Sequence, residues 1–209
     1  MKKMNKILSV MMAAAMTVSM TACGGDTASD NTSASADNSA ATTESAAAGS
    51  TDGQKYTIGI LQQLEHPALD AASQGFEDAL TELLGADNVT FDLQNAQGEQ
   101  ANCSSIATTF VSNNYDLILA NATTALQASA AATSTIPVLG TSVTDYATAL
   151  DIDDWTGATG KNISGTSDLA PLDQQAEMLQ ELFPDAENVG LLYCSGEPNS
   201  VYQVNLVQG

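Results

Sequence analysis

The stretch "YTIGIL" at residues 56–61 decides the fold. It is a short apolar run rich in strand-forming residues, and after Thr57 it shows no alternation of polar and apolar positions. A strand with this pattern is buried on both faces, which is typical of a parallel sheet covered by helices. We therefore expect strands and helices to alternate along the chain that follows.

A helix is predicted directly after this strand. Pro67 suits a first helical turn, because the N–H that proline lacks would have no helical partner there. Apolar residues then recur at spacings of three and four as far as Leu83, and Gly85 offers a C-terminal cap. The pattern predicts a helix that ends at Gly85.

The same alternation continues downstream. It predicts strands at 88–93, 115–120, 136–140 and 188–193, and helices at 99–113, 124–132, 144–150 (short), 172–183 and from Pro198 onward. Strands that alternate with helices of this length indicate an α/β fold with a parallel sheet and helices on both of its faces. One face of the helix at 99–113 should be buried, namely Cys103, Ile106, Ala107, Phe110 and Val111.

The first 22 residues are predicted to be a signal peptide. Three lysines precede an apolar stretch from Ile7 to Met20, a pattern typical of exported proteins. Cys23 follows small residues in "MTAC", which resembles the lipobox of bacterial lipoproteins. An ordinary secretory signal with an incidental cysteine is the alternative. We expect an extracytoplasmic protein that is lipid-anchored to the bacterial cell membrane through Cys23.

The domain organisation follows from a change in composition. Residues 24–54 contain no aromatic residue and no Val, Ile, Leu or Met, so residues 23–54 are predicted to be a lipidated cysteine and a disordered tether. Residues 55–165 are predicted to form an N-terminal α/β lobe. Residues 166–209 are predicted to begin a second, truncated α/β lobe.

The charge of the chain limits its partners. After removal of residues 1–22, only Lys55 and Lys161 oppose 25 acidic residues, which gives a formal charge of −23. Such a chain repels nucleic acid, whose binding depends on neutralising phosphates with Lys and Arg. The chain has no arginine, so no guanidinium can clamp a carboxylate or phosphate at two points.

Cysteine and histidine chemistry is sparse. Cys103 and Cys194 could pair outside a reducing compartment, but the predicted elements place them in different halves of the fold. His66 is the only histidine, and its residue type alone allows a general base, a metal ligand or part of a pocket wall.

Motifs for catalysis are missing from the sequence. No G-x-S-x-G turn accompanies His66, no second histidine lies four residues away, and no glycine-rich phosphate loop follows a predicted strand. We expect a protein that is not an enzyme and that uses no cofactor or metal.

Candidate binding residues lie in the turns after the strands, because ligands of open α/β sheets bind at the carboxyl ends of the strands. These turns are rich in amides and hydroxyls, as expected for a site that holds a polar small molecule by hydrogen bonds. They are "QQLEH" (62–66), "QNAQG" (94–98), "NATT" (121–124), "TSVTD" (141–145) and "CSGEPNS" (194–200).

A family resemblance rests on the same turns. The segments 58–80 (with "EHPALD"), "QNAQGEQ", "SVTD", "GTSDLAPLDQQ" and "SGEPNS" occur in one order and resemble the substrate-binding proteins of tryptophan/tyrosine-type ABC importers. The resemblance covers residues 56–209. It implies a type I periplasmic-binding-protein fold, with a parallel-sheet, Rossmann-like lobe, a second lobe that is incomplete here, and a ligand between them.

The resemblance also assigns binding residues. It implies that His66 is a pocket or loop-bracing residue rather than a catalyst; a packing role away from ligand is the alternative. The residues carried over are Gln62, Glu65, His66, Asn95, Thr123, Thr144, Asp145, Gly196, Glu197, Asn199 and Ser200, and Thr124 and Ser142 lie in the same turns.

A zwitterionic ligand would have to be held without arginine. Its carboxylate is expected at helix N-termini, near Thr123 and Thr124 or near Asn199 and Ser200. Its ammonium is expected at a carboxylate, first Asp145 and then Glu197 or Glu65.

Two functional hypotheses remain. The first is a lipid-anchored solute-binding protein that delivers a small zwitterion, an amino acid such as tryptophan or tyrosine, to ABC permease subunits. The second is an extracytoplasmic sensory module of the same fold. Because the sequence stops within a predicted helix, at "VYQVNLVQG", we expect it to be a fragment of a longer product.

Overall fold

The computed structural model describes residues 53–208. The predicted signal peptide, the lipidation of Cys23 and nearly all of the predicted tether therefore lie outside the described residues. The elements are β1 (Tyr56–Gln62), α1 (Pro67–Leu84), β2 (Val89–Asn95), α2 (Gln100–Ser112), β3 (Leu117–Asn121), α3 (Thr123–Ala132), β4 (Val138–Val143), α4 (Tyr146–Leu150), β5 (Ile163–Ser167), α5 (Leu172–Leu182) and α6 (Pro198–Gln208).

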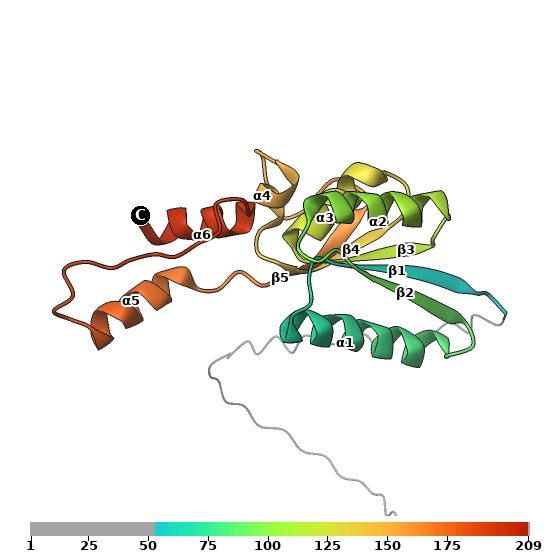
Figure 1. The fold of residues 1–209 in the computed structure, drawn as a ribbon, viewed down its shortest axis with the longest axis horizontal. Coiled ribbons are helices and arrows are strands. Elements are labelled where there is room, and N and C mark those ends of the chain that lie inside the picture. Colours follow the sequence, from blue (N-terminus) through green and yellow to red (C-terminus); the bar gives the residue numbers. More distant parts are fainter. Residues whose placement is uncertain (1–52, 209) are drawn as a thin grey trace, which may run out of the picture. The chain divides into compact units, whose positions relative to one another are not determined.

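The five strands form one parallel sheet in the order β2-β1-β3-β4-β5. Helix α1 covers one face of the sheet, and α2 and α3 cover the other (Figure 1). This arrangement confirms the predicted α/β class and the buried first strand. Ile58, Ile60 and Leu61 of β1 are all at most 3 % exposed, because helices cover both sides of the strand.

The main core lies between the sheet and the pair α2 and α3. Successive strand residues point to opposite faces, and the register places Leu61 beside Ala120 on the face that α2 and α3 cover. Of the predicted apolar face of α2, Cys103, Ala107 and Phe110 are completely buried, and Ile106 and Val111 are half-buried and pack against the core.

Helix α1 packs less deeply than α2 and α3. Ser73 is its only buried residue, and Leu83 is 60 % exposed. The predicted ends of the helix are nevertheless confirmed. Pro67 begins it, and Gly85 ends it with φ 86° and an N–H that donates to the Thr81 carbonyl at 2.9 Å.

The predicted strand at 188–193 is wrong. These residues form neither strand nor helix, and Leu192 is fully exposed. A strand needs a neighbour that accepts and donates its backbone hydrogen bonds, and no strand of the described residues lies beside this segment. The apolar run has the right composition for a strand but has no sheet to join.

The sheet instead gains β5, which the sequence analysis did not assign. Only Ile163 of its five residues is buried, so its apolar signal is weak. The segment is a strand because its backbone pairs in parallel with β4, with Ile163 beside Val138 and Gly165 beside Gly140. Cys103 and Cys194 are both free thiols, the first buried and the second exposed.

Candidate functional site

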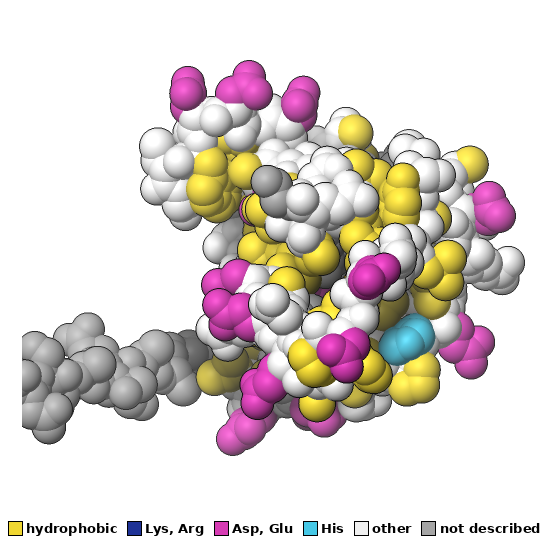
Figure 2. Space-filling view, turned by 90° about the vertical axis from the view of Figure 1, so that its left-hand side faces the viewer, with side chains coloured by type: hydrophobic (Ala, Val, Ile, Leu, Met, Phe, Trp, Pro, Cys, Tyr) yellow, Lys and Arg dark blue, Asp and Glu magenta, His cyan; other side chains and the backbone are white. Residues whose placement is uncertain are grey.

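The carboxyl ends of the parallel strands bring the predicted turns to one edge of the sheet. Gln62 ends β1, Asn95 ends β2, Asn121 ends β3, and Asp145 follows β4 by two residues. Figure 2 views the molecule from the side on which α5 and α6 lie in Figure 1 and shows acidic side chains spread among apolar ones, with no lysine in view. The edge therefore presents hydrogen-bonding groups and negative charge to a ligand.

A buried polar network joins the ends of β1 and β3 to α1. Ser73 donates its hydroxyl to Oε1 of Gln62 at 2.8 Å and accepts from Nδ2 of Asn121 at 3.0 Å. The amide nitrogen of Gln62 donates to Asp70 at 2.6 Å, and that of Asn121 also donates to the Leu69 carbonyl at 2.8 Å. The predicted site residue Gln62 thus positions the first turn of α1 and is itself only 2 % exposed.

His66 braces the same turn. It is the N-cap residue of α1, and its Nδ1 accepts the backbone N–H of Ala68 at 3.2 Å. An N-cap acceptor satisfies an N–H that has no partner within the helix. His66 is exposed and is not among the residues that line the cavity described below. Of the two roles that the family resemblance implies, pocket residue and loop-bracing residue, this contact fits loop bracing.

Gln63, which was not among the predicted site residues, connects several of the turns at this edge. Its side chain is 6 % exposed. Its Oε1 accepts the backbone N–H of Thr124 at 3.3 Å, and its Nε2 donates to Oε1 of Glu197 at 3.2 Å. Its backbone N–H donates to the Asn121 carbonyl at 3.2 Å, and its carbonyl accepts from the Gly98 N–H at 2.8 Å.

These contacts surround a cavity of about 420 Å³ at the strand ends. A volume of this order is within the range of small-ligand pockets. The cavity lies between the turns after β1, β2 and β3 and the segment before α6. Its lining is Gln63, Gly98, Gln100, Thr124, Gln127, Cys194, Gly196, Glu197 and Pro198.

Two of the predicted ligand-binding residues, Thr124 and Glu197, therefore line one cavity, together with Gly196. Thr124 contributes a backbone N–H from the first turn of α3, where the N-cap residue Ala122 offers no side-chain acceptor. Glu197 contributes a carboxylate opposite it. The cavity thus has a partial positive charge from a helix N-terminus on one side and a negative charge on the other.

Asp145 has a structural partner of its own. It is the N-cap residue of α4, and its Oδ1 accepts the backbone N–H of Thr148 at 2.7 Å. It is half-buried and lies outside the lining of the cavity that contains Glu197. Its role as the ammonium partner remains a prediction.

The other predicted residues lie around the same edge without lining this cavity. Asn95 accepts the Gln97 N–H at 2.7 Å, and Ser200 accepts the Cys194 N–H at 3.3 Å. Ser142 has a left-handed backbone with φ 55°, a conformation uncommon outside glycine. The remaining ones are Glu65, which is exposed, Thr123 and Thr144, which are buried, and Asn199, which is half-buried in the first turn of α6.

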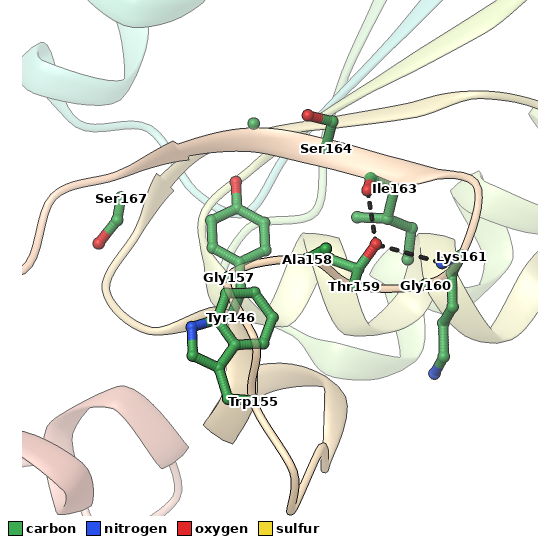
Figure 3. Close-up of a pocket in the computed structure, with 11 residues that line it drawn as sticks. Tyr146, Trp155, Gly157, Ala158, Thr159, Gly160, Lys161, Ile163, Ser164 and Ser167 are labelled. Carbon is green, nitrogen blue, oxygen red and sulfur yellow. Dashed lines mark hydrogen bonds between the residues drawn. The ribbon is translucent and has the colours of Figure 1, made fainter.

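A second cavity, also of about 420 Å³, lies against β5 (Figure 3). Tyr146 and Trp155 lie close together at it, and the loop at 157–161 continues its wall, held by a hydrogen bond from Thr159 to the Ile163 carbonyl at 2.7 Å. None of the predicted binding residues lines it. We therefore assign the candidate site to the cavity around Gln63.

Tyr146 lines this second cavity and packs against β4 and β5. Its hydroxyl points toward β5 in Figure 3 and donates to the Thr166 carbonyl at 3.2 Å. Burial, with a smaller effect of the Asp168 carboxylate, raises the pKa of Tyr146 to about 12. The ring lies against Gly140 and Gly165, where any added Cβ would collide with the tyrosine hydroxyl.

Within residues 53–208, no group of three or more His, Cys, Asp or Glu side chains is placed to hold a metal ion. Across the same span, no helix combines the length and the apolar character needed to cross a membrane.

Comparisons with known proteins show which family and fold the chain resembles. Residues 57–209 match the model of a family described as ABC transporter substrate binding protein. The chain is 38 % identical over 207 residues to a tyrosine-binding protein of Clostridioides difficile (strain R20291), covering 97 % of this chain and 56 % of that protein.

Two solved structures are similar over most of the described part. One is the ABC domain in complex with L-Trp from Streptococcus pneumoniae, with 35 % identity and a TM-score of 0.69, covering 74 % of this chain and 52 % of that one. The other is a conserved domain protein from Vibrio cholerae, with 37 % identity and a TM-score of 0.69, covering 74 % and 53 %. The chain spans about half the length of these relatives.

Proposed function

We propose that this chain, which belongs to the family of ABC transporter substrate-binding proteins, binds an aromatic α-amino acid at the carboxyl edge of its sheet. Its fold is the α/β, type I periplasmic-binding-protein fold that the sequence resemblance implied. The observation that carries the proposal is the cavity that sets the N–H of Thr124 opposite the carboxylate of Glu197. An α-amino acid carries the complementary pair of charges.

The named relatives support the class of ligand. One is a tyrosine-binding protein, and another was solved with L-Trp. Both share more than a third of their matched residues with this chain. We therefore propose tyrosine and tryptophan as the first ligands to test.

In the proposed binding mode, a helix N-terminus rather than an arginine side chain holds the ligand carboxylate. The ligand carboxylate accepts hydrogen bonds from the N-terminal N–H groups of α3, which begins at Thr123 and carries no side-chain cap from Ala122. The ligand ammonium donates to Glu197. In this proposal Glu197 takes the role for which Asp145 was the first choice from sequence, because Glu197 lines the cavity and Asp145 caps α4.

The wider proposal places this binding outside the cytoplasm. Cys23 anchors the mature protein to the membrane through lipid, and the loaded protein delivers its amino acid to ABC permease subunits. The lipobox-like "MTAC" and the apolar segment before it support the anchor. The family of the chain supports the permease partner.

Calorimetry on the full-length protein tests the binding proposal. L-Tyrosine or L-tryptophan should bind, whereas tyramine, which lacks the carboxylate, and 3-(4-hydroxyphenyl)propionate, which lacks the ammonium, should bind far more weakly. Glu197→Gln should weaken amino-acid binding at least about tenfold, since a hydrogen bond to a charged group contributes about 1.5–3 kcal/mol.

Asp145→Asn is the matched comparison for Glu197→Gln. It removes the other predicted carboxylate while keeping an oxygen that caps α4. A tenfold loss in Asp145→Asn with no loss in Glu197→Gln would transfer the ammonium contact to Asp145. Equal binding of tyramine and tyrosine would contradict recognition of the zwitterion altogether.

A further inference from the structure

We propose that the side-chain amide of Gln63 occupies the place of the ligand's carboxylate and ammonium in the empty protein, and that the ligand must displace it. This inference rests on the proposed function of the same cavity. It assigns Gln63, which the sequence analysis did not select, as the residue that sets the specificity for zwitterions.

The acceptor half of the amide meets the N-terminus of α3. Oε1 of Gln63 accepts the Thr124 N–H at 3.3 Å. The N-cap residue of α3 is Ala122 (φ 92°), whose side chain has no acceptor atom to compete for this N–H. A helix N-terminus favours a negatively charged acceptor over a neutral one. A ligand carboxylate is therefore a better partner for this N–H than the amide oxygen is.

The donor half of the amide meets a carboxylate. Nε2 of Gln63 donates to Oε1 of Glu197 at 3.2 Å, across 134 residues of sequence. A hydrogen bond to a carboxylate is already stronger than one between neutral groups, and an ammonium adds a positive charge that attracts the carboxylate directly. A ligand ammonium is therefore a better partner for Glu197 than the amide nitrogen is.

Only the side chain of Gln63 can leave these partners. Its backbone N–H and carbonyl are held by the Asn121 carbonyl at 3.2 Å and the Gly98 N–H at 2.8 Å. Rotation about the side-chain bonds thus releases the Thr124 N–H and the Glu197 carboxylate together, without a change in the backbone of the loop.

This exchange explains which ligands succeed. A ligand that has a carboxylate but no ammonium would place its negative charge beside that of Glu197, and no positive charge would neutralise the two. An amine without a carboxylate would leave the Thr124 N–H without an acceptor once Gln63 has moved, and an unpaired buried donor is costly. An α-amino acid replaces both hydrogen bonds at once.

If the side chain of Gln63 competes with the ligand, replacing it should increase the affinity of the protein for the ligand. Gln63→Ala removes a group that occupies the empty site, so the full-length protein should bind L-tyrosine or L-tryptophan at least about threefold more tightly, because the ligand no longer has to break a neutral hydrogen bond to the Thr124 N–H and a stronger one to the Glu197 carboxylate. Gln74→Ala is the matched control. Gln74 makes the same kind of bond, to Asp78 at 2.9 Å, on the exposed face of α1, and its loss should leave the affinity unchanged.

Three results of this titration separate the two proposals. Tighter binding by Gln63→Ala alone supports displacement. Equal or weaker binding by Gln63→Ala, with normal binding by wild type and Gln74→Ala, would mean that Gln63 braces the site or contacts the ligand, and would overturn this inference while the proposed function stands. No amino-acid binding by wild type would overturn the proposed function, and this inference with it.

A measurement on the wild-type protein covers the case in which Gln63→Ala does not fold. The side-chain NH₂ of Gln63, followed by NMR, should exchange slowly with solvent in the empty protein and faster once saturating L-tyrosine or L-tryptophan is added. Slower exchange after the addition would mean that the ligand closes over an amide that stays in place, which contradicts displacement.

Discussion

Phe110 packs directly over the backbone of Gly59: a Cβ on Gly59 would come within 2.5 Å of the Phe110 ring. Phe110 is completely buried and cannot move away without disturbing the core between α2 and the sheet. Gly59→Ala should therefore lower the free energy of unfolding by about 1–3 kcal/mol, the usual cost of overpacking. Urea unfolding followed by circular dichroism measures it.

Gly75→Ala is the control for this substitution. Gly75 lies within α1, and a Cβ there would meet nothing within 4 Å. Alanine in a helix interior is favoured over glycine by about 0.5–1 kcal/mol, so this variant should be more stable than wild type. Stabilisation by both alanines would show that the Phe110 ring has room to move.

The network around Ser73 should be costly to interrupt. Ser73→Ala deprives Oε1 of Gln62 and Nδ2 of Asn121 of one buried partner each. A buried polar group left without its partner costs about 1–3 kcal/mol, and we expect a loss of stability of that order. Ser104→Ala, which removes an exposed hydroxyl on α2, should change the unfolding midpoint very little. A neutral Ser73→Ala would mean that the network contributes no net stability.

The carboxylate of Asp145 should matter to stability mainly as a helix cap. Asp145→Ala removes the acceptor of the Thr148 N–H and should cost about 0.5–2 kcal/mol. Asp145→Asn keeps an acceptor oxygen and should retain nearly all of the stability. Thermal denaturation of the two variants distinguishes the cap from the charge, and equal losses would point to the charge.

The pH dependence of stability should reveal Tyr146. Its pKa is raised from 10 to about 12 in the folded protein, so folding favours the protonated phenol. That contribution is fully present below about pH 10 and is lost as the pH rises from 10 towards 12. Tyr146→Phe should flatten this part of the profile relative to wild type, as urea unfolding at pH 9, 10 and 11 would show. Parallel profiles for the two proteins would exclude Tyr146 as the source.

The sequence predicted the parts of the fold in which local pattern and tertiary environment agree. Residues 58–61 contain only apolar residues and glycine and are buried. The apolar face of the helix at 99–113 repeats at helical spacing, with Cys103, Ala107 and Phe110 buried and Ile106 and Val111 half-buried. The strand at 188–193 was wrong because its composition says nothing of whether a neighbouring strand exists. β5 was missed for the opposite reason. Exposed Ser164, Gly165 and Thr166 give no apolar signal, and it is the backbone pairing with β4 that makes this segment a strand.

The sequence predicted at which edge of the sheet the candidate site lies, but not which side chains contact one another within it. Parallel strands place the turns after them at one edge, which was enough to indicate the turn that holds Thr124. Glu197 rests on the family resemblance, because the strand predicted before its turn, at 188–193, does not form. Nothing in the sequence distinguished Gln63 from its neighbour Gln62. One becomes part of a buried network with Ser73, and the other reaches Glu197, 134 residues away. Only the folded chain separates these two roles.

The two backbone hydrogen bonds that hold Gln63 have a consequence for the speed of binding. Side-chain rotations take picoseconds to nanoseconds, whereas loop movements take nanoseconds to microseconds. If the amide of Gln63 leaves while its backbone stays bonded to Asn121 and Gly98, vacating the site requires the rotation of one side chain and no movement of the loop.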